Sequence, residues 1–139
     1  METKFEIRKN LEDDVFYLFA KPDFLFINMF KAEVTIDESK KKFTASIPLK
    51  GFILPFNLVL EGHSYASARK INHAFIIPDF AKHRDGVIRI EKYGDLISFY
   101  IKMDLPLNTI YSAFLKKRIW SFRLNFDEIV RIERIKRKI

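Results

Sequence analysis

Acid–base chemistry near neutral pH is best supported in this sequence by a histidine, because an imidazole changes its charge in that range. His73 alternates with Ile71, Phe75 and Ile77, so the two-residue period of a strand places its ring on an apolar face. In that position the ring could orient the polar end of a ligand or act as an acid or base. The alternative interpretation is a neutral core histidine bonded to a neighbouring group, since no carboxylate shares this face.

Metal binding and nucleophilic catalysis find little support. A zinc site built from His63, His73 and His83 would need strand ends and a loop to converge, and no short ligand spacing connects the three residues. The chain has no Cys, which excludes disulfides and thiolate chemistry. No Ser lies in a glycine-flanked elbow, and no glycine-rich phosphate loop is present. We therefore expect no metal and no cofactor, and the sequence favours binding over catalysis.

Large apolar side chains are the most numerous candidates for ligand contact. The chain has fifteen Phe, and 48% of its 139 residues are hydrophobic, so it can bury a substantial core. Phe in this number indicates either a dense aromatic core or an apolar ligand chamber. The residues that we predict to line such a chamber are Phe24, Met29, Phe30, Phe56, Leu58, His73, Phe75, Phe99, Ile101, Met103, Phe122 and Phe126.

The elements that must position these side chains begin with a strand and two short helices. Residues Lys4 to Arg8 alternate apolar with charged side chains, which predicts a half-buried strand. Asn10 is a candidate N-cap for a first helix, which Lys21-Pro22 should end. Residues 22–30 predict a second helix that is apolar on most sides and must therefore be buried or border an apolar ligand.

A two-residue period then continues from Lys31 to Met103 and predicts six consecutive strands. We place them at residues 31–37, 43–49, 52–60, 69–77, 87–92 and 96–103. Gly94-Asp95 predicts a two-residue hairpin turn between the last two strands, and residues 78–85 predict a loop. Consecutive strands joined by short connections are antiparallel. With the first strand they make a seven-stranded antiparallel sheet.

The last quarter of the chain should cover this sheet. Residues 108–139 contain no Gly or Pro, and apolar side chains recur there at alternating spacings of four and three, which predicts one long amphipathic helix. Its apolar seam consists of Leu115, Ile119, Phe122, Phe126 and Ile129. The predicted fold class is therefore α+β, with a curved antiparallel sheet wrapped around a C-terminal helix in one domain of residues 1–139.

The positive charge of the chain is concentrated in the same helix. The net charge is +7, and from Lys116 onward nine Lys or Arg stand against three Asp or Glu, a net +6. An aromatic side chain among cations predicts contact with an anionic membrane, RNA or an acidic protein, unless the cationic stems simply cover it. The predicted partner-binding residues are Lys116, Lys117, Trp120, Arg123, Leu124 and Arg131. Residues 133–139 should leave the core as a basic projecting end.

The order of these elements resembles the START-like superfamily, also called SRPBCC, which includes the birch-pollen allergen, polyketide cyclases and the carbon-monoxide-dehydrogenase accessory subunit. The resemblance covers nearly the whole chain. It rests on the strand Thr3 to Lys9, the helix starts Asn10-Leu11-Glu12-Asp13-Asp14-Val15-Phe16 and Lys21-Pro22-Asp23-Phe24-Leu25, and the C-terminal helix. It implies a helix-grip fold, with an apolar cavity between sheet and helix for lipids, sterols, polyketides or similar ligands. Some members are enzymes, and many only carry or present a ligand.

We therefore predict that the chain binds or carries a hydrophobic small molecule or lipid in this cavity. Two alternatives stay open: an interaction module whose basic helix contacts RNA, a ribosome, an anionic membrane or a protein, and a cyclase-like or hydrolase-like enzyme that uses His73. The lack of Cys and Gln beside plentiful Lys, Arg, Glu and Ile favours a thermophilic source. With the START-like resemblance, we expect a thermophilic archaeal branch of that superfamily. No signal-peptide core or membrane-length apolar run occurs, so a cytoplasmic protein is expected.

Overall fold

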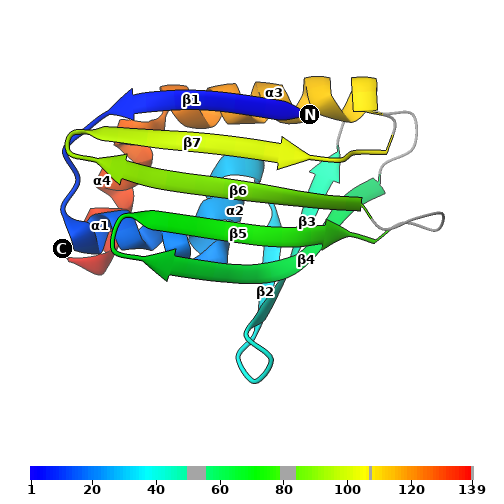
Figure 1. Ribbon diagram of the computed structural model, residues 1–139, viewed down its shortest axis with the longest axis horizontal. Helices are drawn as coiled ribbons and strands as arrows, with labels where there is room; N and C mark the ends of the chain where they lie inside the picture. The colour runs from blue at the N-terminus through cyan, green and yellow to red at the C-terminus, as the bar shows by residue number, and fades with distance from the viewer. Residues whose placement is uncertain (50–55, 79–83, 107, 139) are drawn as a thin grey trace.

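Seven antiparallel strands form one open sheet, and helices cover one of its faces (Figure 1). The computed structural model describes residues 1–49, 56–78, 84–106 and 108–138, with the side chains of Phe56 and Asn108 left out. The strand order is β1-β7-β6-β5-β4-β3-β2, so the first strand of the chain lies beside the last one. The strands are β1 (Glu2–Arg8), β2 (Glu33–Asp37), β3 (Lys42–Leu49), β4 (Phe56–Ser67), β5 (Lys70–Ile77), β6 (Arg84–Tyr93) and β7 (Leu96–Met103). The predicted fold class is confirmed.

The inward face of the sheet carries the side chains that the two-residue period places there. In β3, β5 and β7 buried residues alternate with more accessible ones along the strand. Phe5 of β1 is paired with Phe99 of β7, and their rings stack at 4.8 Å between centroids. The turn at Gly94-Asp95 joins β6 to β7, and Gly94 adopts the left-handed φ of +60° that such a turn favours.

Three strands differ clearly from the sequence-based expectation. β6 begins at Arg84, inside the loop predicted at residues 78–85, and is therefore longer than the predicted strand 87–92. β4 does not end at Glu61-Gly62 but continues to Ser67, because Gly62 is paired with Phe75 in the middle of the ladder between β4 and β5. The predicted start of that strand at residues 52–55 lies outside the described residues. β2 is also less buried than expected: Ile36 is 40% exposed, because the β2–β3 hairpin extends away from the helices (Figure 1).

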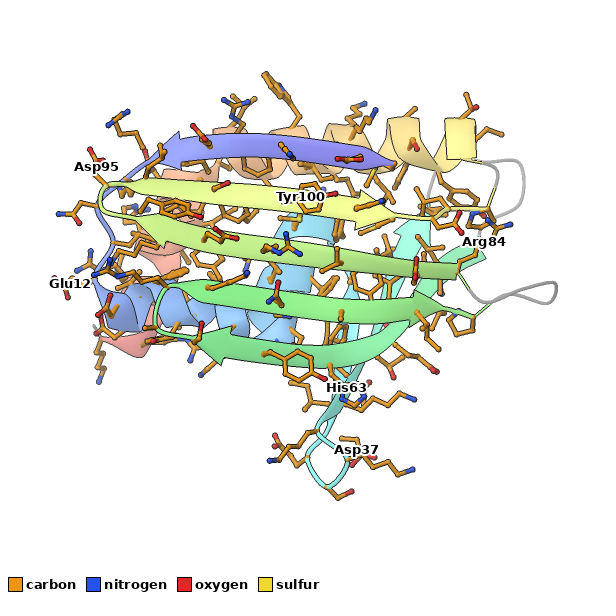
Figure 2. All side chains as sticks on the ribbon, viewed as in Figure 1. Glu12, Asp37, His63, Arg84, Asp95 and Tyr100 are labelled. Carbon is orange, nitrogen blue, oxygen red and sulfur yellow. The ribbon has the colours of Figure 1, made fainter. Side chains whose placement is uncertain are left out.

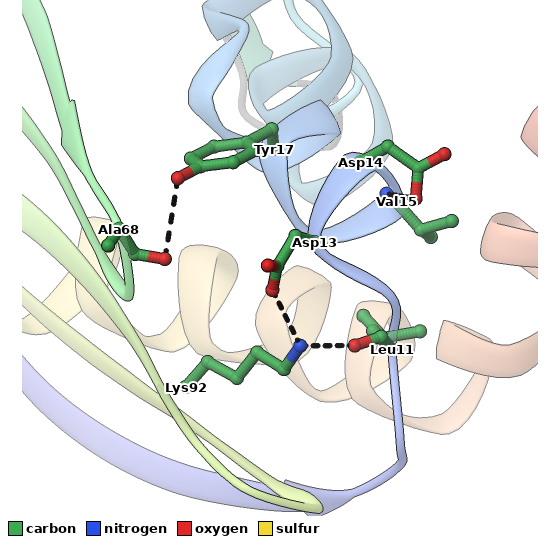
Figure 3. A network of polar contacts seen from close by, with 7 residues as sticks. All are labelled: Leu11, Asp13, Asp14, Val15, Tyr17, Ala68 and Lys92. Atoms are coloured by element: carbon green, nitrogen blue, oxygen red, sulfur yellow. Dashed lines mark hydrogen bonds and ion pairs between the residues drawn. The ribbon is translucent and has the colours of Figure 1, made fainter.

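The first helical segment is shorter than predicted and begins later. Helix α1 (Asp13–Phe16) passes directly into a 3-10 turn, η1 (Tyr17–Ala20), and the residue at the N-cap is Glu12 rather than Asn10. Lys92 at the end of β6 anchors this segment. Its ammonium group donates to the Leu11 carbonyl and lies 3.1 Å from the Asp13 carboxylate (Figure 3). Tyr17 adds a bond from its hydroxyl to the Ala68 carbonyl.

Helix α2 (Pro22–Phe30) begins where expected, with Pro22 in its first turn. It ends at Lys31, which adopts a left-handed φ of 56°, and its backbone N–H donates to the Ile27 carbonyl. Phe24, Leu25, Phe26, Met29 and Phe30 are buried, which agrees with a helix that is apolar on most sides.

The C-terminal segment is two helices rather than the predicted single one. Helix α3 (Asn108–Leu124) and helix α4 (Phe126–Arg137) meet at Asn125, whose φ of −99° and ψ of 10° interrupt the regular helix. The Asn125 side-chain amide donates to the Ser121 carbonyl, which illustrates how Asn competes with helix geometry. In α4 the buried residue after Phe126 is Val130, whereas Ile129, which was predicted to belong to the seam, is only partly buried.

No helix in the described part of the chain is both long enough and apolar enough to cross a membrane. Residues 134–138 at the end of α4 are exposed.

Candidate ligand-binding groove

The predicted chamber-lining residues gather in the interior between the sheet and the helices. Eleven of the twelve predicted side chains are buried, at 5% exposure or less, and the Phe56 side chain lies outside the described ones. The buried residues are Phe24, Met29, Phe30, Leu58, His73, Phe75, Phe99, Ile101, Met103, Phe122 and Phe126. Their role as ligand contacts stays a prediction.

One part of this interior is filled by a cluster of phenylalanine rings. Phe19 of η1 stacks on Phe126 of α4 at 5.5 Å between ring centroids. Phe99 of β7 packs edge-on against Phe122 of α3 at 5.7 Å. Phe122 and Phe126 also meet edge-on, at 5.9 Å. These contacts join the sheet, the 3-10 turn and both C-terminal helices into one aromatic core of the kind that aromatic pairs stabilise.

His73 lies in a second aromatic cluster and is fully buried. Its ring meets Phe26 and Phe43 edge-on at 5.8 and 6.2 Å between centroids. Nδ1 lies 2.7 Å from Ser64 Oγ, and Nε2 lies 2.7 Å from the Phe19 carbonyl oxygen, to which it must donate. In the neutral ring Nδ1 therefore accepts the Ser64 hydroxyl proton. Burial lowers the pKa of His73 to about 4. This geometry fits a neutral histidine that ties β5 to η1.

An open groove lies between α2 and α3. It has a volume of about 700 Å³. Its floor and walls are mainly apolar, and Met29 and Phe122, two of the predicted lining residues, form part of them. The residues that line it are Ile27, Asn28, Met29, Lys31, Phe114, Lys117, Arg118, Ser121, Phe122, Asn125 and Ile129. A smaller hollow of about 250 Å³ continues it along α4 and shares Ile27, Asn28 and Ile129.

The charged residues of this groove all have the same sign. Its lining includes Lys31, Lys117 and Arg118, and no Asp or Glu among the described residues. Arg118 donates through Nη1 to the Phe30 carbonyl and through Nη2 to the Pro48 carbonyl at 2.9 Å, so it holds α3 against the end of α2. Burial lowers the pKa of the Arg118 guanidinium. Neither lysine makes an ion pair with a described residue. The groove is therefore apolar at its base and cationic at its rim.

Sequence reasoning did not identify most of this groove. Phe114, Arg118, Ser121, Asn125 and Ile129 follow one another at spacings of four, three, four and four, so a second stripe beside the apolar seam was detectable. Because the stripe mixes apolar and polar residues, it looks like an ordinary helix flank. Only the position of α2 shows that it forms a wall.

The predicted partner-binding residues lie on the outer side of the C-terminal helices. Trp120 and Leu124 are 56% and 68% exposed. The Arg123 guanidinium lies 5.5 Å from the centre of the Trp120 ring, so Arg123 covers one part of this ring. Lys116 and Lys117 are exposed, whereas Arg131 pairs with Glu128 one turn away. The exposed cation–aromatic cluster therefore belongs to α3 more than to α4.

Other candidate side chains do not form a reactive cluster in the described part of the chain. His63 is exposed on the outer face and its Nδ1 lies 2.8 Å from the Lys41 carbonyl oxygen (Figure 2), while His83 lies outside the described residues. The outer face also has a shallow depression of about 860 Å³. Three of its four carboxylates have a side-chain partner: Glu61 pairs with Lys42 at 3.3 Å, Asp104 with Arg84 at 3.2 Å, and Glu2 accepts a bond from the Tyr100 hydroxyl. No group of three potential metal ligands occurs among the described residues.

The fold and the groove define an α+β protein with an open antiparallel sheet, helices on one face, and a candidate site between those helices. A protein-family model described only as "-like" matches residues 1–139, and the chain belongs to the family of that model. No curated protein matches the sequence.

Two solved structures are similar to the chain. A hypothetical protein from Sulfolobus tokodaii superposes with a TM-score of 0.72 at 23% identity, over 99% of both chains. The Mll3558 protein from Rhizobium loti gives a TM-score of 0.45 at 12% identity, over 88% of this chain and 96% of that one. The first similarity shows the fold.

Proposed function

We propose that the protein binds an amphipathic small molecule, with an apolar body and an anionic group, in the groove between α2 and α3. The observation that supports this proposal is the lining itself: apolar side chains at the base, and Lys31, Lys117 and Arg118 at the rim without a carboxylate among the described lining residues. A fatty acid or another lipid-like carboxylate matches this distribution.

The size and the position of the groove support such a ligand. A volume of about 700 Å³ lies within the range of small-molecule sites, which are mostly apolar with a few fixed polar groups. The base reaches the aromatic core through Phe122, which packs on both Phe99 and Phe126. A bound acyl chain would thus extend the existing core rather than require a separate chamber.

The START-like resemblance supports the same class of function. The observed order of one strand, two short helical segments, six strands and a C-terminal helical segment is the order on which the resemblance rests. Members of that superfamily hold apolar ligands between sheet and C-terminal helix. In this chain we place the ligand at the α2 side of α3, because rings fill the space nearer to β7.

A fluorescent fatty acid tests the proposal. Trp120 is the single Trp of the chain and lies beside the groove residue Ser121, so it can transfer energy to a bound dansyl-labelled undecanoic acid. We expect saturable, sensitised dansyl emission. Ile27→Glu should raise the dissociation constant about tenfold or more, because it places a carboxylate in the apolar wall. Ile110→Glu is the matched control, since both side chains are 47% exposed and Ile110 lies outside the groove.

The polarity of the ligand is tested separately. Lys117→Glu should weaken binding of the fatty acid, whereas Lys116→Glu, one residue away and outside the groove, should change it little. A long-chain alcohol should bind more weakly than the carboxylate of the same length and should not respond to Lys117→Glu. Absence of saturable binding, or equal effects of the groove and control variants, would reject the proposal.

The basic outer face of α3 supports a second candidate function, contact with an anionic surface. Lys116, Lys117 and Arg123 surround the exposed Trp120, and α3 contains no Asp or Glu. Such contact should weaken steeply with salt. Co-sedimentation with anionic vesicles, and gel shifts with RNA, at two salt concentrations would separate it from groove binding, which depends mainly on apolar burial.

A further inference from the structure

β1 forms one edge of the sheet, and its outward side chains alternate in charge. Among the described strands it pairs with β7 alone (Figure 1). Glu2, Lys4, Glu6 and Arg8 are exposed, whereas Phe5 between them is buried. An open edge of seven residues without Pro or a bulge is a template for pairing with another strand.

The backbone of the same four residues is directed toward the open side. Met1 and Met103 exchange both backbone bonds, and the Lys9 N–H donates to the Asp95 carbonyl. In an antiparallel ladder hydrogen-bonded pairs alternate with non-bonded pairs, so the odd-numbered residues of β1 bond to β7. The N–H and C=O groups of the even-numbered residues from Glu2 to Arg8 therefore point away from the sheet.

We propose that β1 pairs with β1 of a second copy of this chain, antiparallel about a two-fold axis at Phe5. In this register Glu2 lies opposite Arg8 of the other copy and Lys4 lies opposite Glu6. All four cross-edge pairs then join opposite charges, and each pair uses the backbone groups that face the open side. The two sheets become one continuous sheet through a symmetric interface.

The charge pattern selects this register over its neighbours. A shift by two residues in one direction places Lys4 opposite Lys4 and Glu2 opposite Glu6. The shift in the other direction places Glu6 opposite Glu6 and Lys4 opposite Arg8. Both shifts oppose like charges, which destabilise directly facing strand positions. A shift by one residue would place odd-numbered residues opposite even-numbered ones. The N–H and C=O groups that face the open side would then not meet each other.

The existing contacts of these side chains leave them available for a second copy. Glu2 accepts a bond from the Tyr100 hydroxyl at 3.2 Å and is still exposed. Glu6 makes no ion pair with a described residue, and Lys4 lies over the Tyr100 ring at 5.2 Å. Arg8 pairs with Asp95 at 3.0 Å but remains exposed, and a guanidinium has enough donors for two carboxylates. Trp120 lies near this edge, because Arg123 contacts both the Phe5 ring and the Trp120 ring, and its exposed surface can add apolar area to the interface.

β2, the opposite edge of the sheet, lacks this charge complementarity for pairing with itself. β2 begins with Glu33 and ends with Asp37, so antiparallel pairing of β2 with itself about Thr35 would oppose two carboxylates at each end. Self-association is therefore expected at β1 and not at β2.

Sedimentation equilibrium of the full chain tests the proposal. The wild type should show a concentration-dependent monomer–dimer equilibrium. Glu6→Lys should weaken the dimer about tenfold or more, because it creates two lysine–lysine pairs. Lys4→Glu should weaken it to a similar extent, because it creates two glutamate–glutamate pairs. The exchange variant Lys4→Glu/Glu6→Lys should return to within about threefold of the wild type. Glu33→Lys, the same charge change on β2, should leave the equilibrium unchanged.

Disulfide capture tests the register, since the chain contains no native Cys. Thr3 of one copy should face Ile7 of the other at a non-hydrogen-bonded position, where Cα atoms lie about 4.5 Å apart, within disulfide range. Thr3→Cys/Ile7→Cys should form a covalent dimer under mild oxidation, and Thr3→Cys alone should not. A wild type that stays monomeric at high concentration, an exchange variant that fails to dimerise while folded, or crosslinking by Thr3→Cys alone would overturn the proposal.

Discussion

Nε2 of His73 lies 2.7 Å from the carbonyl oxygen of Phe19, across 54 positions of sequence. This bond joins β5 to the 3-10 turn η1, in which Phe19 also contributes its ring to the aromatic core. Together with the bond between Nδ1 and Ser64, it makes His73 a polar connection inside a largely apolar interior.

Replacement of His73 should cost much stability. His73→Leu leaves the Phe19 carbonyl and the Ser64 hydroxyl without their partner, and we expect the free energy of unfolding to fall by about 2–4 kcal/mol. Urea denaturation followed by circular dichroism measures this change. His63→Ala, which removes an exposed histidine from the outer face, should change it by less than about 0.5 kcal/mol. Equal effects of the two substitutions would contradict the assigned role of His73.

The same residue should make stability depend on pH. Burial lowers the pKa of His73 from 6.5 to about 4, so the unfolded chain binds this proton more readily than the folded chain. The contribution of His73 is fully present above pH 6.5 and is lost as the pH falls toward 4, with a maximum of about 3 kcal/mol. Carboxylates also titrate at the lower end, so the measurement is the difference in urea midpoint between wild type and His73→Gln at each pH. A difference that stays constant between pH 7 and 4.5 would exclude this linkage.

Gly62 and Gly86 flank Phe75 on the two neighbouring strands and should respond differently to an added methyl group. A Cβ at Gly86 would lie 2.5 Å from the Phe75 ring, whereas a Cβ at Gly62 would meet the Ala74 carbonyl and the Phe75 Cα. Gly86→Ala should cost about 1–3 kcal/mol, and less in a Phe75→Leu background. Gly62→Ala should cost about 3 kcal/mol in either background, because backbone cannot move aside. Calorimetric melting of the single and double variants gives the comparison.

Arg118 should act as a clamp between α3, α2 and β3. Arg118→Met removes the bonds to the Phe30 and Pro48 carbonyls and should lower the free energy of unfolding by about 1–3 kcal/mol. Arg118→Lys keeps the charge but not the planar fork, so it should recover part of the loss. Arg123→Met is the control; it removes ring contacts at the surface and should cost less than about 1 kcal/mol. Full recovery by lysine would show that charge alone accounts for the effect.

The strands could be predicted well from sequence because their signal is local. The period from Lys31 to Met103 identified six strands, and short turns between them required antiparallel neighbours. The break at Asn125 was not predicted, since the apolar spacing continues through it. The side-chain bond from Asn125 to Ser121 that accompanies the break leaves no periodic signal in the sequence. Burial of His73 followed from its place among apolar residues, but its partner Phe19 lies on a distant segment that no periodicity locates.

The groove was beyond prediction for a related reason. Its two walls come from α2 and from a mixed stripe of α3 and α4, and no pattern within either segment shows that they face each other. The charges on its rim come from two segments, with Lys31 at the end of α2 and Lys117 and Arg118 on α3. By contrast, the alternation of Glu2, Lys4, Glu6 and Arg8 was visible in the sequence, but only the strand order shows that it lies on an edge.

The pairing of the first strand with the last has a consequence for the order of folding. Strands β2 to β7 form a meander of local hairpins, which can assemble as soon as each segment has been synthesised. β1 has no partner until β7 exists, because every pair in its register joins positions at opposite ends of the sheet-forming chain. We therefore expect β1 to dock late, after a loop closure that slows folding relative to the meander. Until then β7 is itself an open edge, and a nascent chain is most vulnerable to misassociation at this stage.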